Sequence, residues 1–152
     1  MSSRTCLILA ALFGFLAVLL GAFGAHGLSD TGYLERSYAE MDPKKVSGMH
    51  LTASYKYYLD FQTSVRYHMW HALALLCIGL WKRHQDSKWL SVAAWSFVTG
   101  IVLFSGVLYV LVIGGPHFGG ITWGKVAPIG GTALLIGWIT MLVAACQKQT
   151  ND

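Results

Sequence analysis

Charged side chains are scarce in this sequence: they make up 12% of the 152 residues, against about a quarter in a typical soluble domain. Hydrophobic residues make up 55%, and the mean hydropathy is +0.51. This shortage of charge argues against an ordinary soluble domain and indicates membrane-spanning segments. The net charge of +4 does not indicate nucleic acid, because the basic residues lie beside apolar segments rather than on one polar face.

Familiar catalytic and metal-binding motifs are also missing. The three cysteines, Cys6, Cys77 and Cys146, are far apart and include no C-x-x-C pair, which leaves zinc and thiol–disulfide chemistry of the usual types without support. The glycine-rich stretches match neither the phosphate-binding loop G-x-x-x-x-G-K-[ST] nor the nucleophile elbow G-x-S-x-G. We therefore expect a protein that is not an enzyme.

Four long apolar segments are present, at about residues 6–25, 62–81, 89–113 and 126–146. Each reaches the roughly 20 residues that a helix needs to cross the hydrocarbon core, and none shows the apolar–polar alternation of a membrane strand. The first segment is longer than the core of a signal peptide, about 7–15 residues, so we expect it to be retained. The sequence predicts one all-α membrane domain over residues 1–152 with four transmembrane helices.

The positions of the cations predict the orientation. Lys82, Arg83 and Lys88 lie in the short loop between the second and third segments, Arg4 precedes the first segment, and Lys148 follows the fourth. Short cytoplasmic loops carry an excess of lysine and arginine, so both termini are predicted to be cytoplasmic.

A long loop, about residues 27–61, then lies on the extracytoplasmic side. Aromatic side chains near its end are typical of a membrane interface; they are Tyr55, Tyr57, Tyr58, Phe61 and Tyr67. The stretch from about 45 to 60 is predicted to form a helix that either lies on the membrane or extends the second span.

No aspartate or glutamate falls within any predicted span, which argues against a proton-coupled pump. Histidine is the remaining titratable candidate. His68 and His71 are three residues apart and share a helix face, and His26 reaches the same level from the first span. Imidazole suits a transition metal or haem, so these three residues are a candidate metal site.

A simpler role for these polar residues stays open. A neutral His71 that hydrogen-bonds a neighbouring helix is the more common arrangement, and His26 could cap the end of the first span. Arg66 could extend toward headgroups, bind an anionic lipid or pair with Asp60.

Small residues in the spans allow helices to approach closely, within one monomer or in a dimer. The candidate packing positions are Gly14, Gly21, Gly24, Gly106, Gly131 and Gly137.

Four stretches carry a family resemblance: "GAFGAHGL" (21–28), "YHMWHALALL" (67–76), "GIVLFSGVLYVLVI" (100–113) and "APIGGTALLIGW" (127–138). In this order they resemble the YgdD-like family, domain of unknown function 423, which comprises small bacterial inner-membrane proteins with eukaryotic relatives such as transmembrane protein 256. The resemblance implies four spans in the inner membrane and no established activity. It also implies that His71 and His26 matter more than His68, and it singles out His26, Tyr67, His71, Ser105, Tyr109, Pro128 and Trp138.

Three functions are compatible with the sequence. The first is an accessory or scaffold protein that binds lipid, another membrane protein or a second copy of itself. The second is a histidine-based metal or haem protein. The third is a small transporter or channel with a polar lining from His71, Ser105 and Tyr109.

Overall fold

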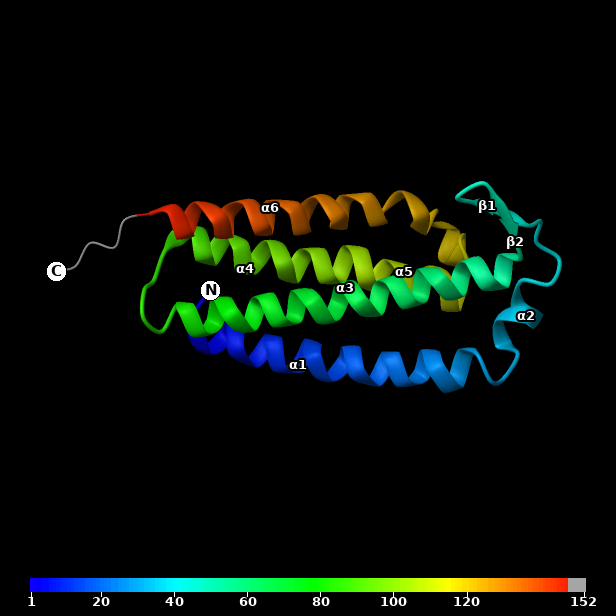
Figure 1. The fold of residues 1–152 in the computed structure, drawn as a ribbon, viewed down its shortest axis with the longest axis horizontal. Helices are drawn as coiled ribbons and strands as arrows, with labels where there is room; N and C mark the ends of the chain where they lie inside the picture. The colour runs from blue at the N-terminus through cyan, green and yellow to red at the C-terminus, as the bar shows by residue number, and fades with distance from the viewer. Residues whose placement is uncertain (148–152) are drawn as a thin grey trace.

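Four long helical rods lie lengthwise beside one another in the computed structural model, which describes residues 1–147 (Figure 1). The first rod joins α1 (Ser3–Ala22) to the π-helical segment η1 (Phe23–Leu28), and the second is α3 (Ala53–Trp81). The third rod joins α4 (Lys88–Gly100), the π-helical segment η2 (Ile101–Gly106) and α5 (Val107–Gly114). The fourth is α6 (Ala127–Cys146), which follows two short 3₁₀ turns, η3 (Phe118–Gly120) and η4 (Trp123–Lys125).

Three of the rods are long and apolar enough to cross a membrane: Ser3–Leu28, Lys88–Gly114 and Trp123–Cys146. These rods contain the first, third and fourth predicted spans. The rod α3 has 29 residues but does not meet the same test of composition, because its first half is polar. The mainly helical, membrane-spanning character of the chain is therefore confirmed.

Side chains that cap helix ends explain where three of the rods begin. Ser2, Thr52 and Ser87 accept hydrogen bonds from the backbone N–H groups of Thr5, Tyr55 and Trp89, which have no partner inside their own helices. The rod α6 begins instead with Pro128 in its first turn, where a missing N–H costs least.

The N-terminus, the α3–α4 loop and the end of α6 lie together at one end of the bundle (Figure 1). Four of the cations that predict the orientation, Arg4, Lys82, Arg83 and Lys88, belong to these segments, and we call this end the cationic end. Arg4, Arg83 and Lys88 are exposed there, whereas the Lys82 side chain is only 1% exposed. The fifth predicted cation, Lys148, lies outside the described residues.

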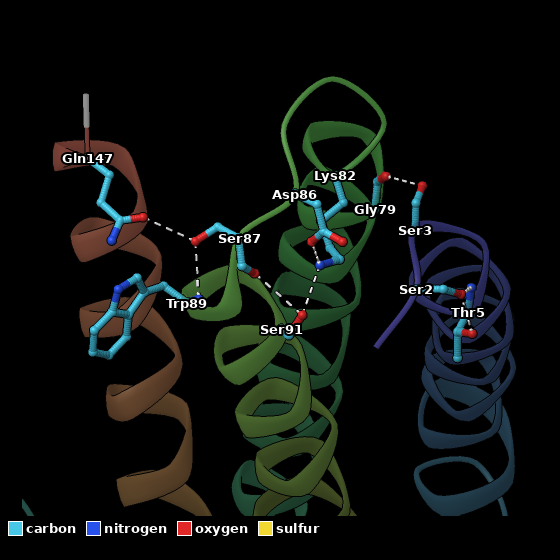
Figure 2. A network of polar contacts seen from close by, with 10 residues as sticks. All are labelled: Ser2, Ser3, Thr5, Gly79, Lys82, Asp86, Ser87, Trp89, Ser91 and Gln147. Atoms are coloured by element: carbon cyan, nitrogen blue, oxygen red, sulfur yellow. Dashed lines mark hydrogen bonds and ion pairs between the residues drawn. The ribbon is translucent and has the colours of Figure 1, made fainter. Parts of the chain in front are cut away.

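Polar contacts join neighbouring rods at this cationic end (Figure 2). Ser3 of α1 donates to the carbonyl of Gly79 in α3, with 2.7 Å between the oxygens. The ammonium of Lys82 donates to Ser91 of α4 at 2.9 Å and pairs with Asp86. That hydrogen bond from Lys82 holds the pKa of the Asp86 carboxyl below its usual value. The buried lysine is thereby neutralised where α3 meets α4.

The opposite end of the bundle carries the long loop. It contains the short helix α2 (Tyr33–Ser37) and an antiparallel hairpin of β1 (Lys44–Val46) and β2 (Met49–Leu51), with Lys45 opposite His50. The hairpin corrects the expectation of a helix from residue 45. Only residues from 53 onward are helical, so the predicted extension of the second span is present and the loop ends at residue 52 rather than 61.

Two tyrosines of this loop cap the end of α5. The Tyr33 hydroxyl donates to the carbonyl of Ile113 at 2.6 Å, and the Tyr38 hydroxyl donates to that of Val112 at 2.8 Å. These carbonyls have no partner within their own helix. Tyr38 is buried and stacks on Tyr57, with 4.3 Å between ring centroids. Burial raises the pKa of its hydroxyl, which therefore stays protonated as a donor. The loop is thus packed onto the helices.

The third rod and α6 approach closely at Gly100 and Gly130, which are not among the predicted packing positions. A Cβ added at Gly130 of α6 would come under 3.0 Å from the backbone nitrogen of Phe104 in η2. A Cβ at Gly100 would meet the side chain of Leu134 and lie 3.2 Å from the carbonyl oxygen of Gly130. The backbones of α6 and the third rod are therefore in direct contact.

The predicted packing glycines differ in their surroundings. A Cβ at Gly24 or Gly137 would overlap a phenylalanine ring, and one at Gly21 would touch Val65 at 3.4 Å. Gly131 and Gly106 have only ordinary contacts, at 3.8 Å, and Gly14 faces open space. Gly14 therefore makes no close contact with another helix among residues 1–147.

Candidate functional site

A belt of buried polar side chains crosses the middle of the bundle, between two apolar clusters. On α3 the belt consists of Ser64, His68 and His71, which lie four and three residues apart on one face. Apolar residues of α3 pack above and below it. Ser105 of η2 and Thr140 of α6 are the other buried polar residues of the central region. Three polar residues of the predicted second span thus face the interior of the bundle, whereas Arg66 is exposed.

His68 lies between the first and third rods. Its Nδ1 is 3.3 Å from the hydroxyl of Tyr109 on α5, and the ring of Phe13 on α1 packs edge-on against it at 5.5 Å. Within residues 1–147, the Nε2 of His68 and the hydroxyl of Ser105 are buried without a hydrogen-bond partner. Ser105 belongs to a π-helical segment, and such segments are frequent at functional sites.

His71 has both ring nitrogens occupied. Its Nδ1 lies 2.7 Å from the carbonyl oxygen of Tyr67, and its Nε2 lies 3.2 Å from the indole nitrogen of Trp138 on α6. An indole N–H can only donate, so Nε2 must be the acceptor and Nδ1 must carry the proton. His71 is therefore a neutral imidazole that links α3 to α6.

Aromatic rings surround His71 on several sides. Phe97 lies 5.4 Å, Tyr67 5.8 Å and Trp138 6.1 Å from it, measured between ring centroids. Phe97 also packs edge-on against Trp138 at 5.3 Å. This packing holds the imidazole in one orientation and keeps its residue 4% exposed.

A groove of about 710 Å³ opens beside this histidine on the outer surface of the bundle, between α3 and α6. We call it the α3–α6 groove. Its lining is mainly apolar and comprises Tyr67, Trp70, His71, Leu73, Phe104, Gly131, Leu134, Leu135 and Trp138. Trp70 and Leu135 are more than half exposed, so the groove is open to whatever surrounds the helices. Its volume lies within the range of small-molecule sites, about 300–1,000 Å³.

The three candidate metal ligands do not converge. His26 lies in η1, where its Nδ1 is 3.3 Å from the Asp30 carboxylate and its side chain is 81% exposed. His68 and His71 are buried and turn to different partners, Tyr109 and Trp138. No group of three histidine, cysteine or acidic residues able to hold a metal occurs in the part of the chain that the structure describes.

The other residues singled out in the sequence lie in different places. Tyr67 and Trp138 line the α3–α6 groove, and Tyr109 lies beside His68. Ser105 is buried in η2, and Pro128 is in the first turn of α6. The sequence reasoning did not identify Trp70, Phe104 and Leu135 as lining residues. Nothing in their spacing along the chain could have shown it, because the groove exists only where two distant segments pack together.

The fold and this site define a class: a small multi-pass helical membrane protein with a polar belt in its interior and a lateral apolar groove. The family described as "Protein of unknown function (DUF423)" matches residues 20–131. The chain belongs to this family, as the four sequence stretches indicated.

Relatives resemble the chain over nearly its whole length. The UPF0382 inner membrane protein YgdD of Escherichia coli (strain K12) is 36% identical over 146 residues, which cover 95% of this chain and 92% of that protein. The UPF0382 membrane protein YwdK of Bacillus subtilis (strain 168) is 36% identical, with 93% and 96% covered. A UPF0382 membrane protein of Haemophilus influenzae is 37% identical, with 95% of each covered.

No solved structure matches the chain. The names of the relatives describe a membrane location and no activity. Together with the three apolar rods, they confirm the predicted location, a multi-pass protein of the inner membrane.

Proposed function

We propose that this chain is a non-enzymatic inner-membrane protein whose four rods all cross the bilayer with both termini in the cytoplasm, and that it binds a membrane lipid in the α3–α6 groove. The single observation that carries the lipid proposal is the groove itself. It is mainly apolar, opens on the outer surface of the bundle, and is lined in part by η2 and α6, which belong to rods long and apolar enough to cross a membrane.

The amphipathic character of α3 supports its crossing the membrane with the other three. Its polar residues in the central region, Ser64, His68 and His71, are buried against neighbouring rods. After Arg66 and Tyr67, its large exposed residues are apolar, namely Trp70, Leu73, Leu76 and Leu80. A helix of 29 residues is about 43 Å long, which exceeds the roughly 30 Å hydrocarbon core. Its first turns, with Lys56 and Asp60, therefore extend into the interface.

The cationic end of the bundle supports the proposed orientation. Arg4, Arg83 and Lys88 lie with the N-terminus and the α3–α4 loop at that end. Short loops rich in lysine and arginine remain in the cytoplasm. The loop with α2 and the β1–β2 hairpin then faces the opposite side.

The floor of the groove supports an apolar occupant. The indole N–H of Trp138 and the two nitrogens of His71 already satisfy one another and the carbonyl of Tyr67. None of these groups needs a polar ligand, so a hydrocarbon chain can cover them without leaving a hydrogen bond unmade. The same pairing leaves His71 no free basic nitrogen, which supports a role in binding rather than in catalysis.

Native mass spectrometry of the full chain, purified in mild detergent, tests lipid binding. A Cβ at Gly131 would touch only the Phe104 ring, at 3.8 Å, so Gly131→Leu places a side chain in the groove without disturbing the bundle. We expect bound lipid to fall by about tenfold in this variant, the effect of about 1.4 kcal/mol.

Gly14→Leu is the matched control, because Gly14 lies on α1 with open space around it. This variant should retain lipid as the unaltered protein does. Equal lipid occupancy in both variants, or no lipid on the unaltered protein, would show that the groove is not a lipid site. The same spectra report dimers and bound proteins, and so distinguish a scaffold role.

A further inference from the structure

Arg66 lies on the same face of α3 as two residues of the α3–α6 groove. It precedes Trp70 by four residues and Leu73 by seven, which are the spacings of one helix face. Side chains on a helix lean toward its N-terminus. The start of α3 is at the end of the bundle that carries the long loop. The guanidinium group therefore extends from the groove toward that membrane interface.

This arginine is exposed and has no ion pair among residues 1–147. The acidic residue closest before it on α3, Asp60, pairs with Lys56 instead. Arg66 also lies about one turn inside the span that begins near residue 62. An arginine at this depth is stabilised when it reaches the interface and meets an anion there.

The groove suits the apolar part of a ligand, and Arg66 suits an anionic part of the same ligand. Two polar side chains of the groove, Trp138 and His71, bond to each other. Within the described residues, the groove lining contains no charged residue, and Arg66 lies one turn before Trp70 on α3, toward the interface. A planar guanidinium matches a phosphate with two parallel N–H donors, which a lysine ammonium cannot do.

We propose that the α3–α6 groove and Arg66 form a phospholipid site in the leaflet on the side of the long loop, with an acyl chain in the groove and the lipid phosphate on Arg66. This inference rests on the proposed lipid-binding function and adds to it the class of lipid and the residue that selects it. The occupant is a whole phospholipid, so free inorganic phosphate should bind far more weakly than the lipid.

The test compares phosphatidylglycerol with a diacylglycerol of the same acyl chains, added to the delipidated full-length protein in detergent and counted by native mass spectrometry. We expect the unaltered protein to prefer phosphatidylglycerol by about tenfold or more, the effect of one charge-assisted pair. Arg66→Gln should bring the two affinities within about twofold by weakening only phosphatidylglycerol, whereas Arg66→Lys should retain part of the preference.

Arg36→Gln is the matched control, because Arg36 is an exposed arginine on α2 that does not line the groove. This variant should keep the full preference. Equal binding of the two lipids by the unaltered protein, or an undiminished preference in Arg66→Gln, would overturn the assignment of Arg66. Competition by millimolar inorganic phosphate would show an anion site that needs no lipid chain. If neither lipid binds, or if Gly131→Leu has no effect on either, the proposed function itself fails.

Discussion

The ring of His71 and the indole of Trp138 form the one polar link between α3 and α6 at the centre of the bundle, within the described residues. Because the indole can only donate, this bond also fixes which nitrogen of His71 carries the proton. A protonated His71 would place a second N–H against the indole, and the link would be lost. The residue that first suggested a metal ligand is thus held as a neutral acceptor.

A double-mutant cycle with His71→Phe and Trp138→Phe measures this bond. Hydrogen bonds between membrane helices contribute about 0.6 kcal/mol on average, so we expect a coupling energy of about that size in unfolding free energies measured in mixed micelles. His71→Gln should lose less than His71→Phe, because an amide oxygen can still accept from Trp138.

Two outcomes contradict this interpretation. Strictly additive single variants would mean that the two side chains do not interact. Tightly bound transition metal in the unaltered protein, lost in His71→Gln, would make His71 a ligand and require a different arrangement of its nitrogens.

At the scale of elements, the contact between α6 and η2 requires glycine at position 130 but not at the adjacent position 131. Gly130 faces η2, whereas Gly131 lines the α3–α6 groove. Only Gly130 meets the backbone of another rod, at Phe104 and Leu103. A backbone cannot rotate away as a side chain can, so a Cβ at this position forces the two rods apart.

Gly130→Ala should therefore lower the free energy of unfolding by about 1–3 kcal/mol, the usual cost of overpacking. Gly131→Ala is the matched comparison, since its Cβ would have only an ordinary contact with Phe104; it should stay within about 0.5 kcal/mol of the unaltered protein. Thermal unfolding in the same detergent measures both. Equal stabilities for the two variants would be inconsistent with direct backbone contact at Gly130.

The long loop packs against the end of α5. Its tyrosines Tyr33 and Tyr38 donate to the last carbonyls of α5, and Leu34 and Tyr38 enter the apolar cluster at that end. The loop therefore closes the end of the third rod, in addition to any contact with a partner outside the membrane.

At the scale of the whole molecule, the four rods and their two unequal ends predict a definite arrangement in the membrane. The cationic end, where Lys82 is buried beside Asp86, is expected in the cytoplasm. The end with α2 and the hairpin is expected outside it.

Cysteines at Asp42 and His84, two exposed loop positions at opposite ends, test this arrangement. Asp42→Cys should react with a membrane-impermeant maleimide in intact spheroplasts. His84→Cys should react only after the membrane is opened, and so should the native Cys146. The reverse pattern would mean that the protein has the opposite orientation. Labelling of both loops in intact spheroplasts would mean that α3, the rod that lies between them in the chain, does not cross the membrane.

The sequence by itself determined the class of protein and much of its layout. Apolar runs and clustered cations are local properties of the chain, and the free energy of moving them into lipid hardly depends on their partners. The approximate positions of the rods therefore followed from composition, and the extension of the second span was one of two alternatives that the sequence left open. The beginnings of three rods also agree with their capping residues.

Only the tertiary structure decided which side chains meet. Whether Gly130 or Gly131 touches η2, whether His71 faces His26 or Trp138, and whether Arg66 lies along a groove all depend on how each rod is rotated and shifted against its neighbours. Close packing of four rods fixes those rotations together, and no stretch of one rod contains that information. For the same reason the sequence could not show that His26, His68 and His71 contact different partners. It also could not show that α3 and α6, which are far apart in the chain, form a groove together.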